Sequence, residues 1–328
     1  MMPNFKVTPI TKGGALLEDA LGRKILVSSD PASHKVETGT LILKTPVSKV
    51  VACSPIHLAF ALRLEKEFGG VLDKFVGILN AAEAHLVLPE LIERFRSGKI
   101  RDIRSIAELR SLQPDLVFSF IYPRDDPQLV HIMERFKLPH VVVDSWYETT
   151  YPDRVRWIEF MGQFFGLGNE AHSLVERIVE ELKAIRENKR SQNRTKVIWF
   201  VDFQGYAFVT GGKSWVAKSI DELGGEVLTP DPDTPGSADA TKEWISENLP
   251  KADVMVFTMV RPNVAHIEQL YPGITQTPAY KSKRIYGFSV NYWQESAYAP
   301  EKWYDELSSI LSPEPTANEL RVFAAARM

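Results

Sequence analysis

The stretch that decides the fold runs from residue 151 to residue 190 and reads YPDRVRWIEFMGQFFGLGNEAHSLVERIVEELKAIRENKR. Its first part carries apolar residues at helical spacing, and Gly166 and Gly168 then interrupt the pattern. Asn169 is a candidate cap for a second helix, which has an apolar stripe from Ala171 to Ile185 and charged residues on its other face. About 20 helical residues reach roughly 30 Å, the width of a small domain. We therefore predict a backbone helix over about residues 169–189 that joins two similar lobes and leaves a cleft between them.

Short apolar runs alternate with helical patterns on both sides of this helix. The first half has predicted strands at 50–53, 76–79, 116–120 and 141–144, with helices at 56–68, 89–96, 106–112 and 129–136. The second half has predicted strands at 197–201, 227–228, 254–257 and 285–288, with helices at 215–223, 242–249 and 300–311 and shorter turns at 267–270 and 277–281. Strands that are each followed by a helix indicate a parallel sheet with both faces covered. The predicted fold is α/β, with two Rossmann-like lobes that have parallel central sheets and are joined by a long backbone helix.

The same patterns predict the domain boundaries. Residues 1–48 form an N-terminal extension, 49–150 the N-terminal lobe, 151–190 the connecting helices and 191–328 the C-terminal lobe. The extension contains two apolar runs, at 24–27 and 40–44, which are separated by turn residues. We expect these two runs to pair as antiparallel strands.

Composition excludes several classes of protein. The chain has 328 residues, 44% hydrophobic and 25% charged, and a net charge of −3, which argues against a nucleic-acid binder. The single cysteine, Cys53, excludes an internal disulfide and a multi-cysteine metal cluster. No apolar run reaches the roughly 18 residues that cross a bilayer. The first fourteen residues lack the charged and apolar regions of a secretory signal.

Ligands of open α/β sheets bind just beyond the carboxyl ends of the strands. The residues predicted at those ends, and therefore as ligand-binding, are Ser54, His57, Asn80, Tyr122, Trp146 and Tyr147 in the first half and Tyr206, Phe208, Trp215, Arg261, Tyr292 and Trp293 in the second. Aromatic side chains supply large contact areas with few rotamers to lose, so the set suits a bulky, planar or caged ligand. Arg261 could pair with an anionic group of that ligand.

Packing within a lobe is the alternative for several of these residues. Phe208 and Trp215 suit either role. The pairs Trp146–Tyr147 and Tyr292–Trp293 are expected in loops, where adjacent side chains point in different directions, so only one of each pair need line the site.

Signals for catalysis and for a resident metal are weak. Residues 211–214, GGKS, resemble the tail of a phosphate-binding loop, but Ala207 stands where its first glycine would fall. No nucleophile with a base is evident, and none of the motifs HExxH, GxSxG or strand-linked GxGxxG occurs. His57 is the best candidate metal ligand, together with Asp144 or Glu148, although a lone histidine at a helix start is more often a cap or a packed side chain. We therefore predict no catalytic residues, no metal site and no intrinsic cofactor.

Acidic residues occupy corresponding regions of the two halves. Glu90 and Glu93 follow the second strand of the first half, and Asp239 and Glu243 lie in the matching region of the second half. Each has the alternative of belonging to a solvated face. A matched acidic residue on each lobe could instead dock a two-fold basic partner.

The chain resembles the helical-backbone (class III) substrate-binding proteins of ABC importers, which carry ferric siderophores, haem or cobalamin. The matching pieces are KVVACSP at 49–55, IAELRSLQPDLV at 106–117, LPHVVVD at 138–144, FMGQFFG at 160–166 running on into Ala171, ADVMVF at 252–257 and AYKSKRIY at 279–286. The resemblance implies a ligand held between two lobes with little closure, and delivery to a membrane permease whose arginines are gripped by one acidic residue per lobe. Glu90 or Glu93, and Asp239 or Glu243, best fit those positions.

The predicted function is an extracytoplasmic substrate-binding protein of an ABC importer, not an enzyme. It would capture an iron chelate (siderophore), haem or a corrinoid as a monomer, in the periplasm or at the cell surface, with its leader absent from this sequence. Two alternatives stay open. One is a cytoplasmic α/β enzyme of unknown reaction, and the other is a bare-metal-ion binding protein of the same fold.

Overall fold

The computed structural model describes residues 4–10, 14–122, 127–189, 193–203, 206–260, 262–288, 292–313 and 320–327. The chain divides into two compact units. The N-terminal unit comprises the chain up to Ser145 together with Val155–Arg177. The C-terminal unit comprises Trp146–Arg154 and the chain from Ile178 onward.

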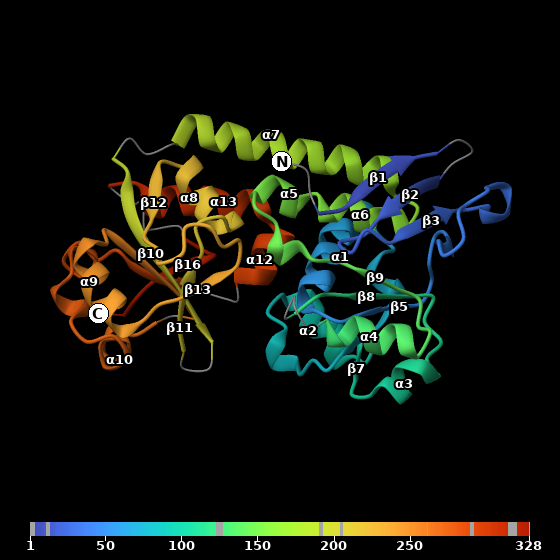
Figure 1. Ribbon diagram of the computed structural model, residues 1–328, viewed down its shortest axis with the longest axis horizontal. Coiled ribbons are helices and arrows are strands. Elements are labelled where there is room, and N and C mark those ends of the chain that lie inside the picture. Colours follow the sequence, from blue (N-terminus) through green and yellow to red (C-terminus); the bar gives the residue numbers. More distant parts are fainter. Residues whose placement is uncertain are drawn as a thin grey trace. The chain divides into compact units, whose positions relative to one another are not determined.

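The main sheet of the N-terminal unit is parallel and has five strands in the order β7-β6-β5-β8-β9 (Figure 1). The strands are β5 (Val50–Ala52), β6 (Phe75–Leu79), β7 (Arg101–Ile103), β8 (Leu116–Ser119) and β9 (His140–Val142). Helices alternate with them: α1 (Pro55–Phe68), α2 (Pro89–Arg96), α3 (Ile106–Ser111) and α4 (Gln128–Arg135). The predicted parallel sheet is confirmed. Strand β7 escaped prediction because its sequence, Arg-Asp-Ile, contains no apolar run.

A smaller four-stranded sheet precedes it, with the order β1-β2-β3-β4. Its strands are β1 (Lys6–Pro9), β2 (Gly14–Glu18), β3 (Lys24–Ser28) and β4 (Leu41–Lys44). The antiparallel pairing expected for residues 24–27 and 40–44 is wrong, because β3 and β4 are parallel. The antiparallel partner of β3 is β2, which meets it through the turn at residues 19–23. Residues 29–40 then return the chain to the end of the sheet at which β3 begins, so β4 runs parallel to β3.

The turn between β2 and β3 is fastened to edge strand β9. Asp19, 2% exposed, accepts hydrogen bonds through Oδ1 from the N–H groups of Leu21 (3.0 Å) and Arg23 (3.1 Å). Its Oδ2 accepts from Arg23 Nη2 (2.6 Å) and from the N–H of Val142 (3.0 Å). Arg23 Nη1 lies 2.6 Å from Nε2 of His140, whose Nδ1 lies 2.9 Å from the carbonyl oxygen of Leu138. Nδ1 therefore carries the imidazole proton and Nε2 accepts from Arg23.

Three helices follow β9: α5 (Tyr151–Val155), α6 (Trp157–Phe164) and α7 (Gly168–Lys189). The predicted long helix is confirmed as α7, and the boundary between the two units falls within it, at Arg177 and Ile178. Gly166 adopts a φ of +74°, which favours glycine, at the turn between α6 and α7. Along the described ranges, no helix combines the length and apolar character required to traverse a lipid bilayer.

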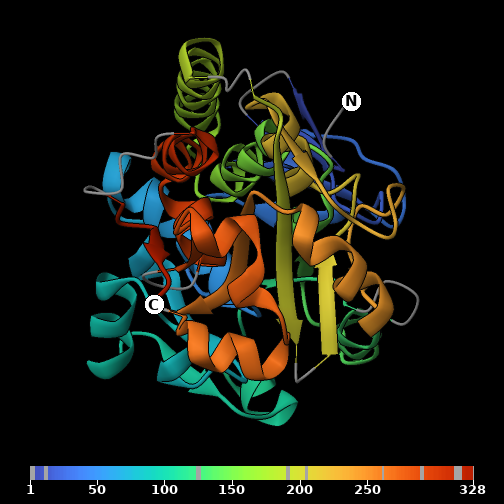
Figure 2. The ribbon, with the colours of Figure 1, turned by 90° about the vertical axis from the view of Figure 1, so that its left-hand side faces the viewer.

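The C-terminal unit contains a seven-stranded sheet in the order β13-β11-β10-β14-β15-β16, with β12 also paired to β10. Figure 2 shows the neighbouring strands β10 and β11 in olive and yellow. The strands are β10 (Thr195–Phe203), β11 (Tyr206–Thr210), β12 (Gly225–Val227), β13 (Ser237–Asp239), β14 (Val254–Val260), β15 (Ile285–Phe288) and β16 (Phe323–Ala325). The helices are α8 (Trp215–Glu222), α9 (Lys242–Asn248), α10 (Val264–Leu270), α11 (Pro278–Lys281), α12 (Tyr292–Tyr298) and α13 (Pro300–Leu311).

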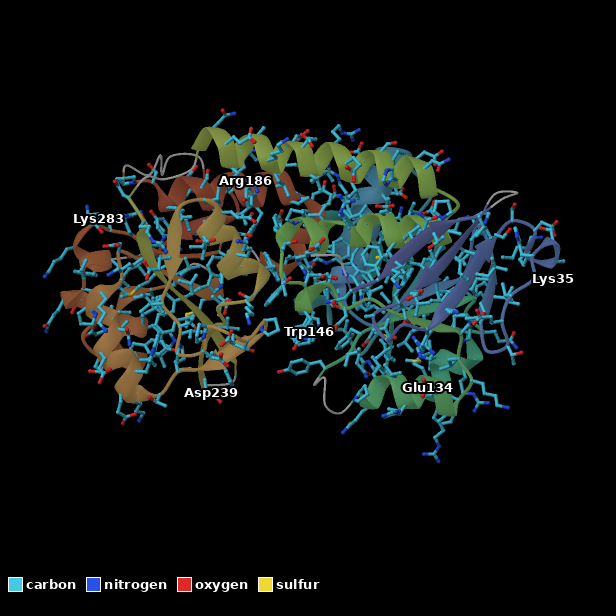
Figure 3. The ribbon with its side chains drawn as sticks, turned by 45° about the horizontal axis from the view of Figure 1, so that its top comes forward. Lys35, Glu134, Trp146, Arg186, Asp239 and Lys283 are labelled. Atoms are coloured by element: carbon cyan, nitrogen blue, oxygen red, sulfur yellow. The ribbon has the colours of Figure 1, made fainter. Side chains whose placement is uncertain are left out.

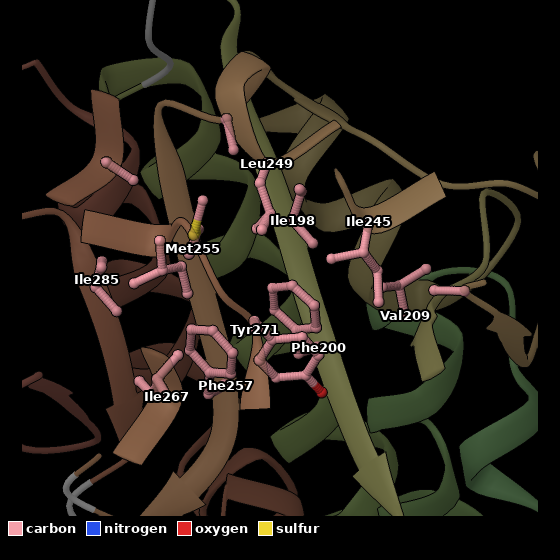
Figure 4. Close-up of a cluster of buried hydrophobic side chains, with 14 of the residues drawn as sticks. Ile198, Phe200, Val209, Ile245, Leu249, Met255, Phe257, Ile267, Tyr271 and Ile285 are labelled. Carbon is pink, nitrogen blue, oxygen red and sulfur yellow. The ribbon is translucent and has the colours of Figure 1, made fainter. Parts of the chain in front are cut away.

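The predicted parallel strands form the centre of this sheet, and the strands that escaped prediction form its antiparallel edges. β12, β10, β14 and β15 are parallel, whereas β11, β13 and β16 are antiparallel to their neighbours. The centre is held by aromatic packing across neighbouring strands (Figure 4). Phe200 of β10 stacks on Phe257 of β14 at 4.5 Å between ring centroids, and Tyr271 lies 4.7 Å from Phe200.

A buried carboxylate holds the last strand in place. Glu306 of α13 is 7% exposed and accepts hydrogen bonds from the N–H groups of Arg321 (2.9 Å), Val322 (2.8 Å) and Phe323 (3.0 Å). We expect Glu306→Gln to lower the free energy of unfolding by about 2 kcal/mol, because the amide has one acceptor oxygen and turns an NH₂ group toward backbone donors. Urea denaturation measures this loss. The exposed Glu247→Gln is the control, and equal losses in the two variants would show that the carboxylate of Glu306 is not an anchor.

Candidate functional site

The carboxyl ends of β6, β5 and β8 present three of the predicted ligand residues. Asn80 follows β6 with an exposed side chain and a φ of +52°, which asparagine tolerates better than most residues. Ser54 follows β5, is half-buried, and caps α1 by accepting a hydrogen bond from the N–H of Ile56 at 3.2 Å. Tyr122, just beyond β8, is 59% exposed. Because these strands are neighbours in one parallel sheet, the three residues lie along a single edge of the N-terminal unit.

His57 does not belong to this exposed edge. Its ring is 2% exposed and packs edge-on against Phe118 and Phe120, with centroid distances of 6.1 and 6.5 Å. Burial lowers its pKa to about 4, and hydrogen bonding to the backbone of Val143 and Phe118 opposes that shift only partly. The structure therefore places His57 in the core, contrary to its prediction as a ligand residue. Among the residues that the structure describes, no group of three or more His, Cys, Asp or Glu side chains is arranged to hold a metal ion.

Trp146 and Tyr147 belong to the C-terminal unit and lie in a short 3-10 helix, η4 (Ser145–Tyr147). Their rings meet edge to face at 5.2 Å, and both are half-buried (Figure 3 labels Trp146). The six-membered ring of Trp146 lies near Gly236, where an added Cβ would come to 4.0 Å from it. Part of the surface of each aromatic side chain is therefore exposed.

Trp215 and Trp293 have different surroundings. Trp215 is 1% exposed, stacks on Tyr151 at 5.2 Å and lies 4.6 Å below the guanidinium of Arg154. It is therefore a core residue, and its prediction as a ligand residue is wrong on this structure. Trp293 is half-buried and meets Trp215 edge to face at 6.2 Å.

Helix α12 and strand β11 carry four of the predicted ligand residues. Tyr292 and Trp293 begin helix α12, whose sequence YWQESAY lacks the apolar spacing that would have revealed a helix. Tyr206 and Phe208 lie on β11, where half-buried Phe208 pairs with Asp239 of β13. The side chains of Tyr206 and Tyr292, and the whole of Arg261, lie outside the described residues.

In the glycine-rich segment 211–214, the backbone N–H groups of residues 212–214 are hydrogen-bonded within the C-terminal unit. The N–H groups of Gly212 and Lys213 donate to the carbonyl oxygens of Asp231 and Thr234, each at 3.0 Å, and Ser214 donates to Gly211 at 3.1 Å. An added Cβ at Gly212 would lie 2.5 Å from the carbonyl oxygen of Pro232, which explains the glycine. These three N–H groups therefore do not form a phosphate cradle.

The acidic docking candidates differ in their surroundings. Glu90 pairs with Lys66 at 2.6 Å, and that hydrogen bond lowers the pKa of its carboxyl group. Glu93 is exposed one turn further along α2. Asp239 of β13 and Glu243 of α9 are also exposed (Figure 3 labels Asp239). Glu93, Asp239 and Glu243 are thus the more accessible candidates.

Sequence reasoning missed Arg154, which is 0% exposed in the C-terminal unit. Its guanidinium lies over the ring of Trp215 and reaches helix α12. A charged residue in an amphipathic stretch is usually solvated, so the sequence carried no signal of this burial.

A model of a periplasmic binding protein family matches residues 57–290, which is more than half of the chain. Among curated proteins, MJ0642 of Methanocaldococcus jannaschii is 20% identical over 280 residues, covering 82% of this chain and 83% of that protein.

Solved structures share the fold. A possible iron-binding, periplasmic solute-binding protein from Staphylococcus epidermidis has a TM-score of 0.61 at 16% identity and covers 81% of this chain and 99% of its own. The periplasmic haem-binding protein HutB of Vibrio cholerae has a TM-score of 0.59 at 14% identity and covers 80% and 98%. A protein of an ABC-type Fe³⁺-hydroxamate transport system from Saccharomonospora viridis has a TM-score of 0.56 at 19% identity and covers 73% and 84%.

Proposed function

Because the chain belongs to this family of periplasmic binding proteins, we propose that it captures an iron chelate, haem or a corrinoid outside the cytoplasm and delivers it to an ABC importer permease. Capture is non-covalent, and the protein acts as a monomeric carrier rather than an enzyme. The observation that carries the proposal is the set of partly exposed aromatic residues just beyond the carboxyl ends of the sheet strands.

The chemistry of these residues favours a bulky ligand with apolar faces. Tyr122 is exposed, and Tyr147, Trp146 and Trp293 are half-buried, so each retains surface on which a flat or caged chelate can pack. Asn80 and Ser54 add polar groups at the same sheet edge of the N-terminal unit. Iron, haem and Fe³⁺-hydroxamate in the names of the structural relatives support the same class of ligand. We propose that these strand-end residues contribute to the site.

Docking to the permease would use exposed carboxylates. We propose Glu93 in the N-terminal unit and Asp239 or Glu243 in the C-terminal unit, because Glu90 already pairs with Lys66. Complementary charge would then set the orientation of the complex and speed its formation.

The test is a titration of the purified protein with ferric haem, a ferric hydroxamate chelate, a corrinoid and free Fe³⁺, followed by tryptophan fluorescence and calorimetry. We expect one chelate to bind 1:1 with a Kd of about 1 μM or tighter. Trp293→Ala and Tyr147→Ala should each weaken binding about tenfold, because each removes an aromatic contact worth about 1.4 kcal/mol.

Phe136→Ala is the matched control, because Phe136 is 37% exposed but precedes β9, at the opposite end of that strand from the candidate site. Its affinity should equal that of the wild type. Binding of free Fe³⁺ alone would favour the bare-metal alternative, and an absence of binding to all four probes would contradict the proposed function.

A further inference from the structure

Helix α12 has little apolar surface with which to hold its place. Among its described side chains, from Trp293 to Tyr298, the buried ones are Gln294, Ser296 and Ala297. Two of these three are polar. A helix normally docks through an apolar stripe, so the position of α12 must depend largely on hydrogen bonds.

Those hydrogen bonds come from the short segment that contains α5. Arg154 Nη2 donates to the carbonyl oxygen of Trp293 and to Oγ of Ser296, both at 3.2 Å. The hydroxyl of Tyr151, one helical turn earlier, donates to the carbonyl oxygen of Ser296 at 2.8 Å. Ser296 Oγ itself donates to the carbonyl oxygen of Trp293 at 3.2 Å. Arg154 therefore contacts the first turn of α12, where the partly exposed Trp293 begins.

Burial of a guanidinium is costly, because the charged group loses its hydration. The indole of Trp215, 4.6 Å from the guanidinium carbon, offsets part of this cost through a cation–π contact. An apolar side chain would fill the same space without the penalty. An arginine here makes physical sense if Nη2, which donates to both Trp293 and Ser296, fixes the geometry of this turn.

We propose that Arg154 is a positioning residue, which fixes the first turn of α12 and with it the indole of Trp293 for ligand binding. The part of this inference that concerns ligand binding rests on the proposed function. The part that concerns the placement of Trp293 by Arg154 rests on the hydrogen bonds and can be tested in the ligand-free protein.

The experiment compares Arg154→Lys with wild type by ¹⁵N NMR of the tryptophan indole N–H groups, of which the chain has seven. Trp293→Phe assigns the signal of Trp293. Lysine keeps a positive charge, but its side chain is one atom shorter and does not place a donor at the position of Nη2, so the Trp293 signal should shift and broaden. Arg156→Lys is the matched control, because Arg156 pairs with Glu176 at 2.6 Å in the N-terminal unit, and it should leave the Trp293 signal unchanged.

The second readout is binding of ferric haem, the ferric hydroxamate chelate or the corrinoid, whichever the wild type binds. Arg154→Lys should weaken that binding at least tenfold, mainly through faster dissociation, while its melting temperature stays within a few degrees of wild type. Ser296→Ala, which removes one acceptor and leaves the arginine in place, should move the Trp293 signal in the same direction and by less. It takes over the test if the arginine variant fails to fold.

An unchanged Trp293 signal in Arg154→Lys, or in Ser296→Ala where that variant takes over the test, would overturn the proposal. So would an affinity loss that the folded fraction of the variant fully accounts for. A wild-type protein that binds none of ferric haem, the ferric hydroxamate chelate and the corrinoid would contradict the proposed function, and the indole signal alone would then decide whether Arg154 places Trp293.

Discussion

Replacing Asp19 with alanine is expected to lower the free energy of unfolding of the N-terminal unit by about 4 kcal/mol. The carboxylate is buried and accepts hydrogen bonds from the backbone of Leu21, Arg23 and Val142 and from the Arg23 side chain. Its removal leaves the Arg23 guanidinium, whose side chain is 28% exposed, with only the exposed carboxylate of Glu134 at 3.9 Å, and it frees the N–H of Val142 on an edge strand. Each of these groups loses an interaction that water cannot fully replace.

Urea denaturation, followed by a probe in the N-terminal unit, measures this loss. The neighbouring Glu18→Ala is the matched control, because Glu18 pairs with Lys6 at 3.1 Å on the surface, where an ion pair contributes at most about 1 kcal/mol. A loss below about 1 kcal/mol for Asp19→Ala would show that the small N-terminal sheet is not fastened to β9 through this carboxylate.

The wild-type protein should lose about 3 kcal/mol of stability through His57 alone as the pH falls from about 6.5 to about 4. Burial lowers the pKa of His57 from 6.5 to about 4. Between these two pH values the imidazole of the unfolded state binds a proton and that of the folded state does not. The contribution of His57 is therefore fully present above pH 6.5, and it is lost as the pH falls toward the pKa of the folded state. Burial also lowers the pKa of His140, which acts in the same direction.

His57→Phe isolates this effect, because phenylalanine fills the aromatic site beside Phe118 without titrating. Urea denaturation at several pH values between 7 and 4.5 should give a flatter pH dependence for the variant than for the wild type. His131→Gln is the control, since the side chain of His131 is 66% exposed, and it should keep the wild-type slope. Equal slopes for His57→Phe and wild type would contradict the buried, neutral imidazole.

The centre of the fold was predictable because its signals are physical necessities of burial. Strands buried on both faces, such as 116–118 and 254–257, must be continuously apolar, and a long helix must show its stripe, as α7 does. Edge strands β7 and β13 are short and partly polar, because one side of an edge strand needs no partner, and edge strand β16 has only three residues. The direction of β4 escaped prediction because it depends on the path of the connection at residues 29–40, which the apolar runs do not reveal.

The sequence predicted where several candidate site residues lie in the fold, but not the directions of their side chains. Carboxyl ends of strands located Asn80, Tyr122 and Trp146, whose side chains keep exposed surface. The same rule selected His57 and Trp215, which turn into the core, because sequence position does not fix the direction of a side chain. Arg154 escaped because nothing in a local pattern distinguishes a buried arginine from a solvated one.

The central claim, that the ligand binds at the carboxyl ends of the strands, is tested most directly by hydrogen exchange of the protein with and without its saturating chelate. The account predicts slowed exchange in the segments that carry Asn80, Tyr122, Trp146 and Trp293, with the rest of the chain little changed. Slowed exchange confined to the small sheet β1–β4, or to the outer face of α7, would contradict it.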